Sequence, residues 1–312
     1  MVRPCAGDGA EYARVGVFRK GMSAPIYLDT DGAERDQYLT NLSWSPDGST
    51  ILLAIVNRAQ NHFDVVAFDA KTGAKLRTLF SEDDEQWAEP EHPAYWVSND
   101  KFVWMSERDG FMNLYLYNSS GKLLRQLTKN DFVATGIAGQ DSKGNILFNA
   151  TGADPRENHL FSVNMRGRQK QLTTGSGYHN ANVQDGGTWF IDNHESVSLP
   201  REITVRQYAG RASRTILKAE DPFEGKNIAK PELGSITGPD GSTLYTRMYK
   251  PFDFDPSKKY PVLVYVYGGP HAQMVTNRWN GGGPLWMNEL ANRGYIVFTL
   301  DNRGSAHRGT DF

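Results

Sequence analysis

The sequence predicts a partial β-propeller, of about four and a half blades in an incomplete ring, followed by the first strands of an α/β domain. Consecutive copies of one pattern, each about 45 residues long, predict the blades. Glycine and Asx residues at equivalent places in the copies predict the hairpin turns. Beyond residue 225 the repeat gives way to a strand, a glycine-rich loop, a helix and another strand, which predicts a mainly parallel sheet. We therefore expect two domains, residues 1–225 and 226–312.

Each copy of the repeat reads as four short strands joined by polar turns. Runs such as residues 51–55 and 63–68 are β-branched or aromatic and have the length of a strand. The copies begin at Leu39, Glu89, Thr135 and His179, and equivalent places are occupied by Leu79, Leu127, Leu172 and Leu217. Four strands in about 45 residues is typical of a propeller blade.

The turns support the same interpretation. Glycine and Asx residues supply the positive φ that tight hairpin turns require. The first hairpin of each copy turns at Pro46-Asp47-Gly48, Asn99-Asp100, Ser142-Lys143-Gly144 and Asp185-Gly186-Gly187, and the second at Thr72-Gly73, Ser120-Gly121, Arg166-Gly167 and Ala209-Gly210. The alternatives are a β-sandwich or an unrelated stack of hairpins, but a sandwich does not repeat its turn chemistry at a fixed period. A further half-blade, residues 12–28, precedes the first copy.

Composition narrows the class of protein. A formal net charge of -2 gives no field that gathers nucleic acid or an anionic membrane. The one cysteine, Cys5, has no partner for a disulfide, and no Cys/His cluster has zinc spacing, so we expect neither a metal nor a cofactor. No apolar run approaches the roughly 20 residues of a membrane span, and the N-terminus lacks the apolar core of a signal peptide.

The second part of the sequence begins with a hairpin over residues 232–250, turning at Gly238-Pro239-Asp240-Gly241. Residues 261–267 then form a nearly continuous apolar run, typical of a strand buried on both faces. Residues 284–293 have helical spacing and stop at Gly294. Residues 295–300 predict another buried strand.

Two motifs of this second part, together with the blades before it, carry a family resemblance. Residues 259–273 read KYPVLVYVYGGPHAQ, residues 292–305 read NRGYIVFTLDNRGS, and residues 106–111 in the blades read SERDGF. These motifs resemble dipeptidyl peptidase IV, within the prolyl oligopeptidase group of serine peptidases. The tyrosine before the Gly-Gly-Pro turn is similar to the dipeptidyl peptidase branch, whereas acylaminoacyl peptidases tend to have histidine there.

The resemblance implies that the second domain is the start of an α/β-hydrolase. It also implies an eight-bladed propeller that gates a cavity, and a serine exopeptidase that releases dipeptides from N-termini with proline or alanine second. Its partners would be peptide substrates, with no cofactor, and the intact protein would be a homodimer. Relatives in bacteria are commonly exported, but the sequence itself does not give a compartment.

Tyr267 is the one catalytic residue that the resemblance assigns. Its hydroxyl would donate a hydrogen bond to the oxyanion of the tetrahedral intermediate, together with a backbone N–H beside the serine. Taken without the family, Tyr267 is an ordinary aromatic residue at the end of a strand. Gly268 and Gly269 allow a sharp turn, and Pro270 fixes its exit.

The catalytic triad is expected outside this sequence. No Gly-x-Ser-x-Gly motif occurs in it, and the nearest glycine-flanked serines, Ser176 and Ser305, are not expected to be nucleophiles. His271 is predicted to be structural because the catalytic histidine of this fold follows the serine and the acid. Asp301 and Arg303 are predicted to form a buried pair that holds the loop. We expect a piece of a longer enzyme that is inactive by itself.

The residues that would bind the substrate amine are also expected elsewhere. The resemblance places paired glutamates in an early blade, and Glu89 and Glu91 are interpreted as solvated loop residues instead. Two alternatives stay open: an acylaminoacyl peptidase or oligopeptidase branch of the same group, and a non-catalytic propeller module that binds proteins.

Overall fold

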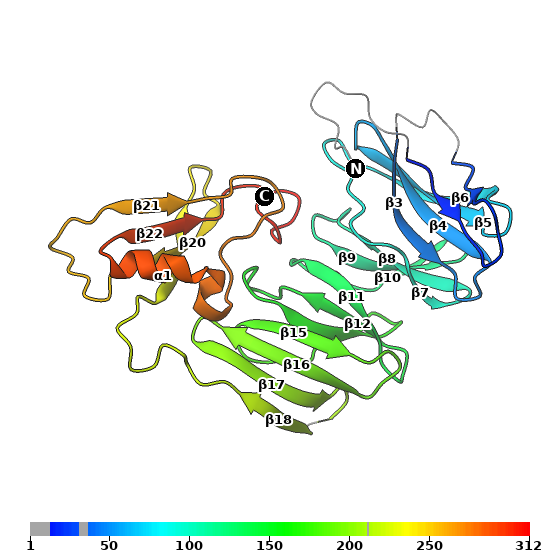
Figure 1. Cartoon of the computed structure of the whole chain (residues 1–312). Coiled ribbons are helices and arrows are strands. Elements are labelled where there is room, and N and C mark those ends of the chain that lie inside the picture. Colours follow the sequence, from blue (N-terminus) through cyan, green and yellow to red (C-terminus); the bar gives the residue numbers. More distant parts are fainter. Residues whose placement is uncertain (1–12, 31–36, 211) are drawn as a thin grey trace. The chain divides into compact units, whose positions relative to one another are not determined.

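The computed structural model describes residues 13–30, 37–210 and 212–312 (Figure 1). Short antiparallel sheets dominate these residues, with helix α1 and the 3₁₀ segment η1 near their C-terminal end. The chain divides into two compact units: unit 1 is residues 1–109 with 113–129, and unit 2 is residues 110–112 with 130–312. Cys5 lies outside the described residues, so the interpretation of that thiol stays a prediction.

Unit 1 holds a small hairpin and two antiparallel four-stranded sheets, each in the sequential order of a propeller blade. The hairpin is the predicted half-blade. Its strands are β1 (Gly16–Val17) and β2 (Ile26–Tyr27). The sheets are β3 (Gln37–Trp44), β4 (Thr50–Asn57), β5 (His62–Asp69) and β6 (Lys75–Asp83), then β7 (Tyr95–Ser98), β8 (Lys101–Ser106), β9 (Asn113–Asn118) and β10 (Leu123–Gln126).

The two sheets of unit 1 pack through their central strands. Leu52 and Val65 of the first sheet share one buried cluster with Phe102 and Tyr115 of the second. The rings of Phe63 and Trp104 lie 6.0 Å apart between centroids. The apolar central strands predicted by the repeat therefore form the core, because a strand covered on both faces must be apolar on both.

Unit 2 begins with two further antiparallel sheets of the same order. They are β11 (Ala134–Gln140), β12 (Ile146–Ala150), β13 (His159–Val163) and β14 (Gln169–Gln171), then β15 (Tyr178–Val183), β16 (Trp189–Ser196), β17 (Leu199–Gln207) and β18 (Ser213–Lys218). Every predicted hairpin turn lies between the strands it was predicted to join. The predicted blades are confirmed as four-stranded sheets, while their arrangement in an incomplete ring stays a prediction.

The last sheet of unit 2 is mixed, in the order β19-β20-β22-β21. Its strands are β19 (Pro231–Thr237), β20 (Thr243–Tyr249), β21 (Val262–Tyr265) and β22 (Ile296–Leu300). Strands β21 and β22 are parallel and are connected through η1 (Trp279–Gly282) and α1 (Leu285–Asn292). Met287 and Ala291 of α1 pack against Tyr249 and Val297 of the sheet. The predicted hairpin, helix and parallel pair are thus present.

Strand β21 differs from the prediction in length and in burial. It ends at Tyr265 rather than at residue 267, and Val262 and Val264 are 57% and 60% exposed. The physical reason is that β21 pairs only with β22 and lies at the edge of the described sheet. The boundary predicted near residue 225 stays a prediction, because the compact units group residues 130–312 together.

Candidate functional site

Tyr267 lies on the turn that follows β21, in an exposed position. It is 67% exposed, and its hydroxyl makes no hydrogen bond to any of the described residues. Gly268 has a φ of 73°. A Cβ on Gly269 would lie 2.6 Å from the Tyr267 ring, so glycine is required for the ring to lie across this turn. The turn therefore presents a phenolic hydroxyl to solvent with its donor unused.

Asp301 anchors the segment that comes after the turn. It follows β22, is buried, and its carboxylate accepts the backbone N–H groups of Met274 at 2.8 Å and Val275 at 3.0 Å. Burial raises the pKa of Asp301, and these two hydrogen bonds oppose that rise. The turn itself is tied at its exit by the His271 N–H, which donates to the Gly304 carbonyl at 3.1 Å.

Arg247 holds the same segment from inside the sheet. Its guanidinium is fully buried and donates to the carbonyl oxygens of Met274 and Gly281, both at 2.6 Å. Burial lowers the pKa of Arg247, since a charged form without solvent is costly. Beside it, the Tyr249 hydroxyl donates to the Asn280 carbonyl at 2.6 Å, and burial raises the pKa of Tyr249 to about 12. These two side chains of β20 fix both ends of the segment.

The predicted pair of Asp301 and Arg303 is wrong. Arg303 forms an ion pair with Asp240 and donates to the carbonyl oxygens of Asp311 and Phe312. Asp301 accepts backbone N–H groups instead. Strand β22 ends at Leu300, and the chain then turns at Arg303-Gly304, where Gly304 has a φ of 86°. Strand alternation no longer applies beyond such a turn, so the Arg303 side chain lies toward the β19–β20 hairpin rather than beside Asp301.

The structure also shows the surroundings of Ser176, Ser305 and His271, which the sequence analysis did not expect to be catalytic. The Ser176 hydroxyl donates to the Glu157 carboxylate, so no histidine nitrogen accepts its proton. Ser305 is buried. His271 has a φ of 58° and lines an open pocket of about 430 Å³ with Tyr178 and Arg278. The assignment of His271 as structural stays a prediction.

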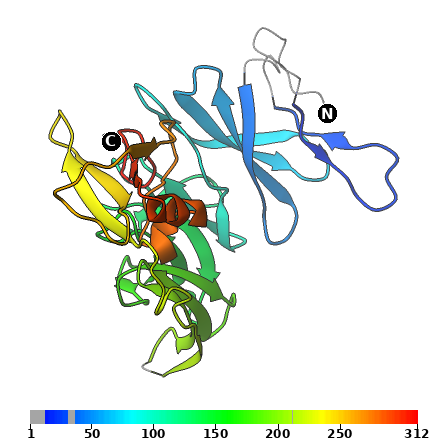
Figure 2. The ribbon, with the colours of Figure 1, turned by 60° about the vertical axis from the view of Figure 1, so that its left-hand side comes forward.

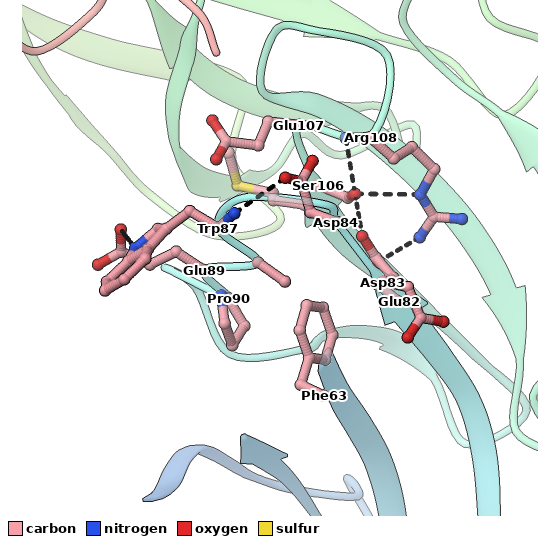
Figure 3. Close-up of a pocket in the computed structure, with 12 residues that line it drawn as sticks. Phe63, Glu82, Asp83, Asp84, Trp87, Glu89, Pro90, Ser106, Glu107 and Arg108 are labelled. Atoms are coloured by element: carbon pink, nitrogen blue, oxygen red, sulfur yellow. Dashed lines mark hydrogen bonds and ion pairs between the residues drawn. The ribbon is translucent and has the colours of Figure 1, made fainter. Parts of the chain in front are cut away.

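A second pocket lies within unit 1 and is much smaller, about 30 Å³, which is room for a water molecule. Figure 3 shows Glu82, Ser106 and Arg108 converging on it. The Glu82 carboxylate pairs with Arg108 and accepts the Ser106 hydroxyl and the Trp104 indole N–H. Burial raises the pKa of Glu82, and Arg108 opposes that rise. Sequence reasoning missed this network, although SERDGF supplies two of its members.

On the rim of this pocket, Glu89 accepts the Trp87 indole N–H at 3.1 Å. Glu91 lies beside His92, with 3.8 Å between carboxylate and imidazole. Both glutamates lie in the loop between β6 and β7, where Glu89 is half-buried and Glu91 is exposed. That they do not bind the substrate amine stays a prediction.

Solved structures with similar folds define the class of protein: it has four-stranded blades like those of dipeptidyl-peptidase-type proteins, followed by a mixed sheet. A structure from Bacteroides ovatus, described as a candidate dipeptidyl aminopeptidase IV, matches 98% of this chain and 46% of its own at a TM-score of 0.91 and 34% identity. Porphyromonas gingivalis dipeptidyl peptidase 4 has the same fold at a TM-score of 0.82, with 23% identity over 92% of this chain and 41% of its own.

Sequence comparison gives the family. Residues 4–201 match the family described as "Dipeptidyl peptidase IV (DPP IV) N-terminal region", so the chain belongs to the dipeptidyl peptidase IV family. Mouse dipeptidyl peptidase 8 is 25% identical over 96% of this chain and 40% of its own length. The Uncinocarpus reesii protein named "Probable dipeptidyl-aminopeptidase B" is 28% identical over 93% of this chain and 34% of its own length. The chain thus spans well under half of these relatives.

Within the described residues, no helix is both long and apolar enough to cross a membrane.

Proposed function

We propose that this chain contributes to a serine-type dipeptidyl peptidase that releases N-terminal dipeptides with proline or alanine in second position. The membership of the family and the names of the relatives support a peptidase. The observation that carries the finer proposal is the exposed, unused hydroxyl of Tyr267 on its Gly-Gly-Pro turn. The proposal includes peptide substrates and a homodimer of the intact enzyme.

In this proposal the last sheet is the start of an α/β-hydrolase domain that begins near residue 226. The parallel pair β21 and β22, connected through α1, supports it because this crossover is the building unit of such sheets. Active-site groups of such sheets lie on loops beyond the carboxyl ends of the strands. Tyr267 and Asp301 both lie just beyond such ends.

The chemistry proposed is acyl transfer. A serine attacks the scissile carbonyl, the carbonyl oxygen gains negative charge, and Tyr267 donates a hydrogen bond to it. One donor of this kind lowers the barrier by about 3 kcal/mol because its dipole is already oriented when the charge develops. No Gly-x-Ser-x-Gly occurs in these 312 residues, so the proposal gives this chain the oxyanion donor and not the nucleophile.

The first experiment measures hydrolysis of glycyl-prolyl p-nitroanilide by the 312-residue chain. We expect no turnover above the buffer rate. Turnover that a fluorophosphonate abolishes would contradict the assignment of the nucleophile to other sequence. Cleavage of an acetyl-alanyl substrate by a polypeptide that includes this chain would favour the acylaminoacyl branch instead.

The second experiment tests Tyr267 in an active polypeptide that includes these residues. Tyr267→Phe is expected to lower kcat about 100-fold with little change in KM, because the donor acts only in the transition state. Tyr265→Phe is the matched control, since the Tyr265 ring packs against Trp286, with 5.7 Å between their centroids. Equal effects of the two substitutions on kcat would overturn the assignment of Tyr267.

A further inference from the structure

The side chain of Asn277 joins the segment between β21 and η1 to three separate loops of the blades. It is only 9% exposed. Its Nδ2 donates to Glu157 Oε1 at 2.7 Å and to Ser176 Oγ at 2.8 Å. Its Oδ1 accepts the Val197 N–H at 3.1 Å, and its own N–H donates to the Arg156 carbonyl at 2.9 Å. Both amide protons and the amide oxygen are therefore used at one point.

Glu157 is the anionic centre of this junction. It lies between β12 and β13, and its carboxylate also accepts hydrogen bonds from Ser176 and from His159 Nε2, the latter at 3.1 Å. Burial alone would raise its pKa, but the hydrogen bonds from His159, Ser176 and Asn277 lower the pKa of Glu157 to about 2. The carboxylate is thus ionised at neutral pH and requires donors around it.

Several other titratable groups face the junction. The ring centroids of His159 and His179 are 5.0 Å apart, and those of His179 and His194 are 4.0 Å apart. His179 Nδ1 lies 3.0 Å from the buried carboxylate of Asp192. Arg156 pairs with Asp154 at 2.7 Å, and Glu195 lies 3.9 Å from Arg278. A change of charge at the junction therefore alters the electrostatic surroundings of titratable side chains on β13, β15, β16 and the loops between them.

The other contacts of the segment are more exposed than Asn277. Gln273 Nε2 donates to the Pro155 carbonyl at 2.7 Å, and the Arg278 guanidinium lies 3.5 Å above the Tyr178 ring. The backbone N–H of Trp279 donates to the Glu195 carboxylate at 3.3 Å. Gln273 and Arg278 of the segment, and Trp279 at the start of η1, are half-buried, whereas Asn277 is buried. Figures 1 and 2 show this orange segment against the green sheet β15–β18, with which η1 is in contact.

We propose that Asn277 is a positioning residue, which fixes the segment behind the Tyr267 turn against the blades through the Glu157 carboxylate. The docking itself is independent of any activity. Its consequence for the reaction rests on the proposed function, because the docked segment continues directly into the turn that carries Tyr267. The anchors on Asp301 and Arg247 tie the segment to its own sheet, and Asn277 ties it to the propeller.

The first test uses hydrogen exchange with mass spectrometry on the 312-residue chain. Asn277→Ala is expected to speed exchange of peptides covering residues 271–283 by about tenfold or more, since it removes every side-chain hydrogen bond of this residue: the Glu157 carboxylate loses one of its donors, and the Val197 N–H loses its acceptor. Asn145→Ala is the matched control, because Asn145 Nδ2 also donates to a carboxylate at 2.7 Å, that of Asp141, but within one blade. Unchanged exchange at 271–283 in Asn277→Ala would overturn the proposal.

The second test exchanges donor and acceptor. Asn277→Asp places a carboxylate against Glu157, so we expect fast exchange at 271–283 at about pH 7 and recovery near pH 4, where the pair shares a proton. Adding Glu157→Gln should restore exchange to within about threefold of wild type at neutral pH, since the glutamine amide then donates to the new carboxylate at position 277 and its oxygen accepts from His159. If residues 271–283 exchange as fast in the double variant as in the Asn277→Asp single variant, the proposed pairing is contradicted.

The two proposals can fail separately. If exchange at 271–283 responds as expected while Tyr267→Phe leaves kcat unchanged in an active polypeptide, the docking role stands and the oxyanion role fails. If exchange does not respond and Tyr267→Phe lowers kcat, the oxyanion role stands and Asn277 is not what positions the segment.

Discussion

At the residue scale, the polar side chains that matter most are those whose partners lie far away in the sequence. Asp301 accepts from Met274 and Val275, and Asn277 donates to Glu157 from another part of the chain. A carboxylate removed from water without donors is costly, so the carboxylates of Asp301 and Glu157 obtain their donors only once the chain has folded. The sequence pattern indicates that these residues exist but not what they contact.

Glu157 gives a pH-dependent prediction. Its pKa is depressed to about 2 from an ordinary 4.5, so the stability it contributes is complete above pH 4.5 and is lost as the pH falls toward 2. We expect wild type to lose about 2 kcal/mol more than Glu157→Gln over this range, at about 1.4 kcal/mol per pKa unit and with allowance for partial solvation. Urea unfolding of both proteins at several pH values measures it. Parallel pH profiles would contradict the prediction.

At the element scale, the glycines in the hairpin turns of the blades have different structural roles. Gly121, in the second hairpin turn of its blade, has a φ of 91°, and a Cβ there would lie 2.3 Å from the Leu79 carbonyl oxygen of β6. Gly48, in a first hairpin turn, has a φ of 69° and nothing within 4 Å of such a Cβ. The same residue type thus serves conformation alone at one turn and close packing between sheets at the other.

We therefore expect Gly121→Ala to destabilise unit 1 by at least about 3 kcal/mol, because conformational strain and a backbone clash add. Gly48→Ala, which suffers only the strain of the left-handed region, should cost about 1 kcal/mol. Thermal unfolding of the two variants beside wild type measures the difference. Similar losses at both positions would mean that Gly121 is not in close contact with β6.

At the scale of the whole molecule, the compact units do not follow the change of sequence pattern. Residues 226–312 group with the blades formed by β11–β18, and Asn277, Gln273 and Arg278 supply contacts between them. Polar contacts of this density couple the stability of neighbouring elements. The sheet β19–β22 is thus expected to depend on the blades beside it.

This grouping predicts that β16 and β20 lose their hydrogen-exchange protection in the same range of urea concentration, because they belong to one cooperative unit. Exchange followed by mass spectrometry at increasing urea measures it. If residues 226–312 open at clearly lower urea than β15–β18, the predicted domain boundary near residue 225 would also be the boundary of cooperative unfolding.

The blades, their turns, the crossover with its helix, and the family could all be predicted from the amino-acid sequence. The blades, turns and crossover follow from local periodicity and from turn residues with special φ values, which act between neighbours in the chain, whereas the family rests on the resemblance of motifs such as residues 259–273. Three others required the folded chain: that β21 is an exposed edge, that Asp301 binds backbone N–H groups rather than Arg303, and that Asn277 meets Glu157. The hydrogen-bonded partners of Asp301 and Asn277 are more than twenty residues away, and in the last case 120, so chain topology and not local pattern brings them together.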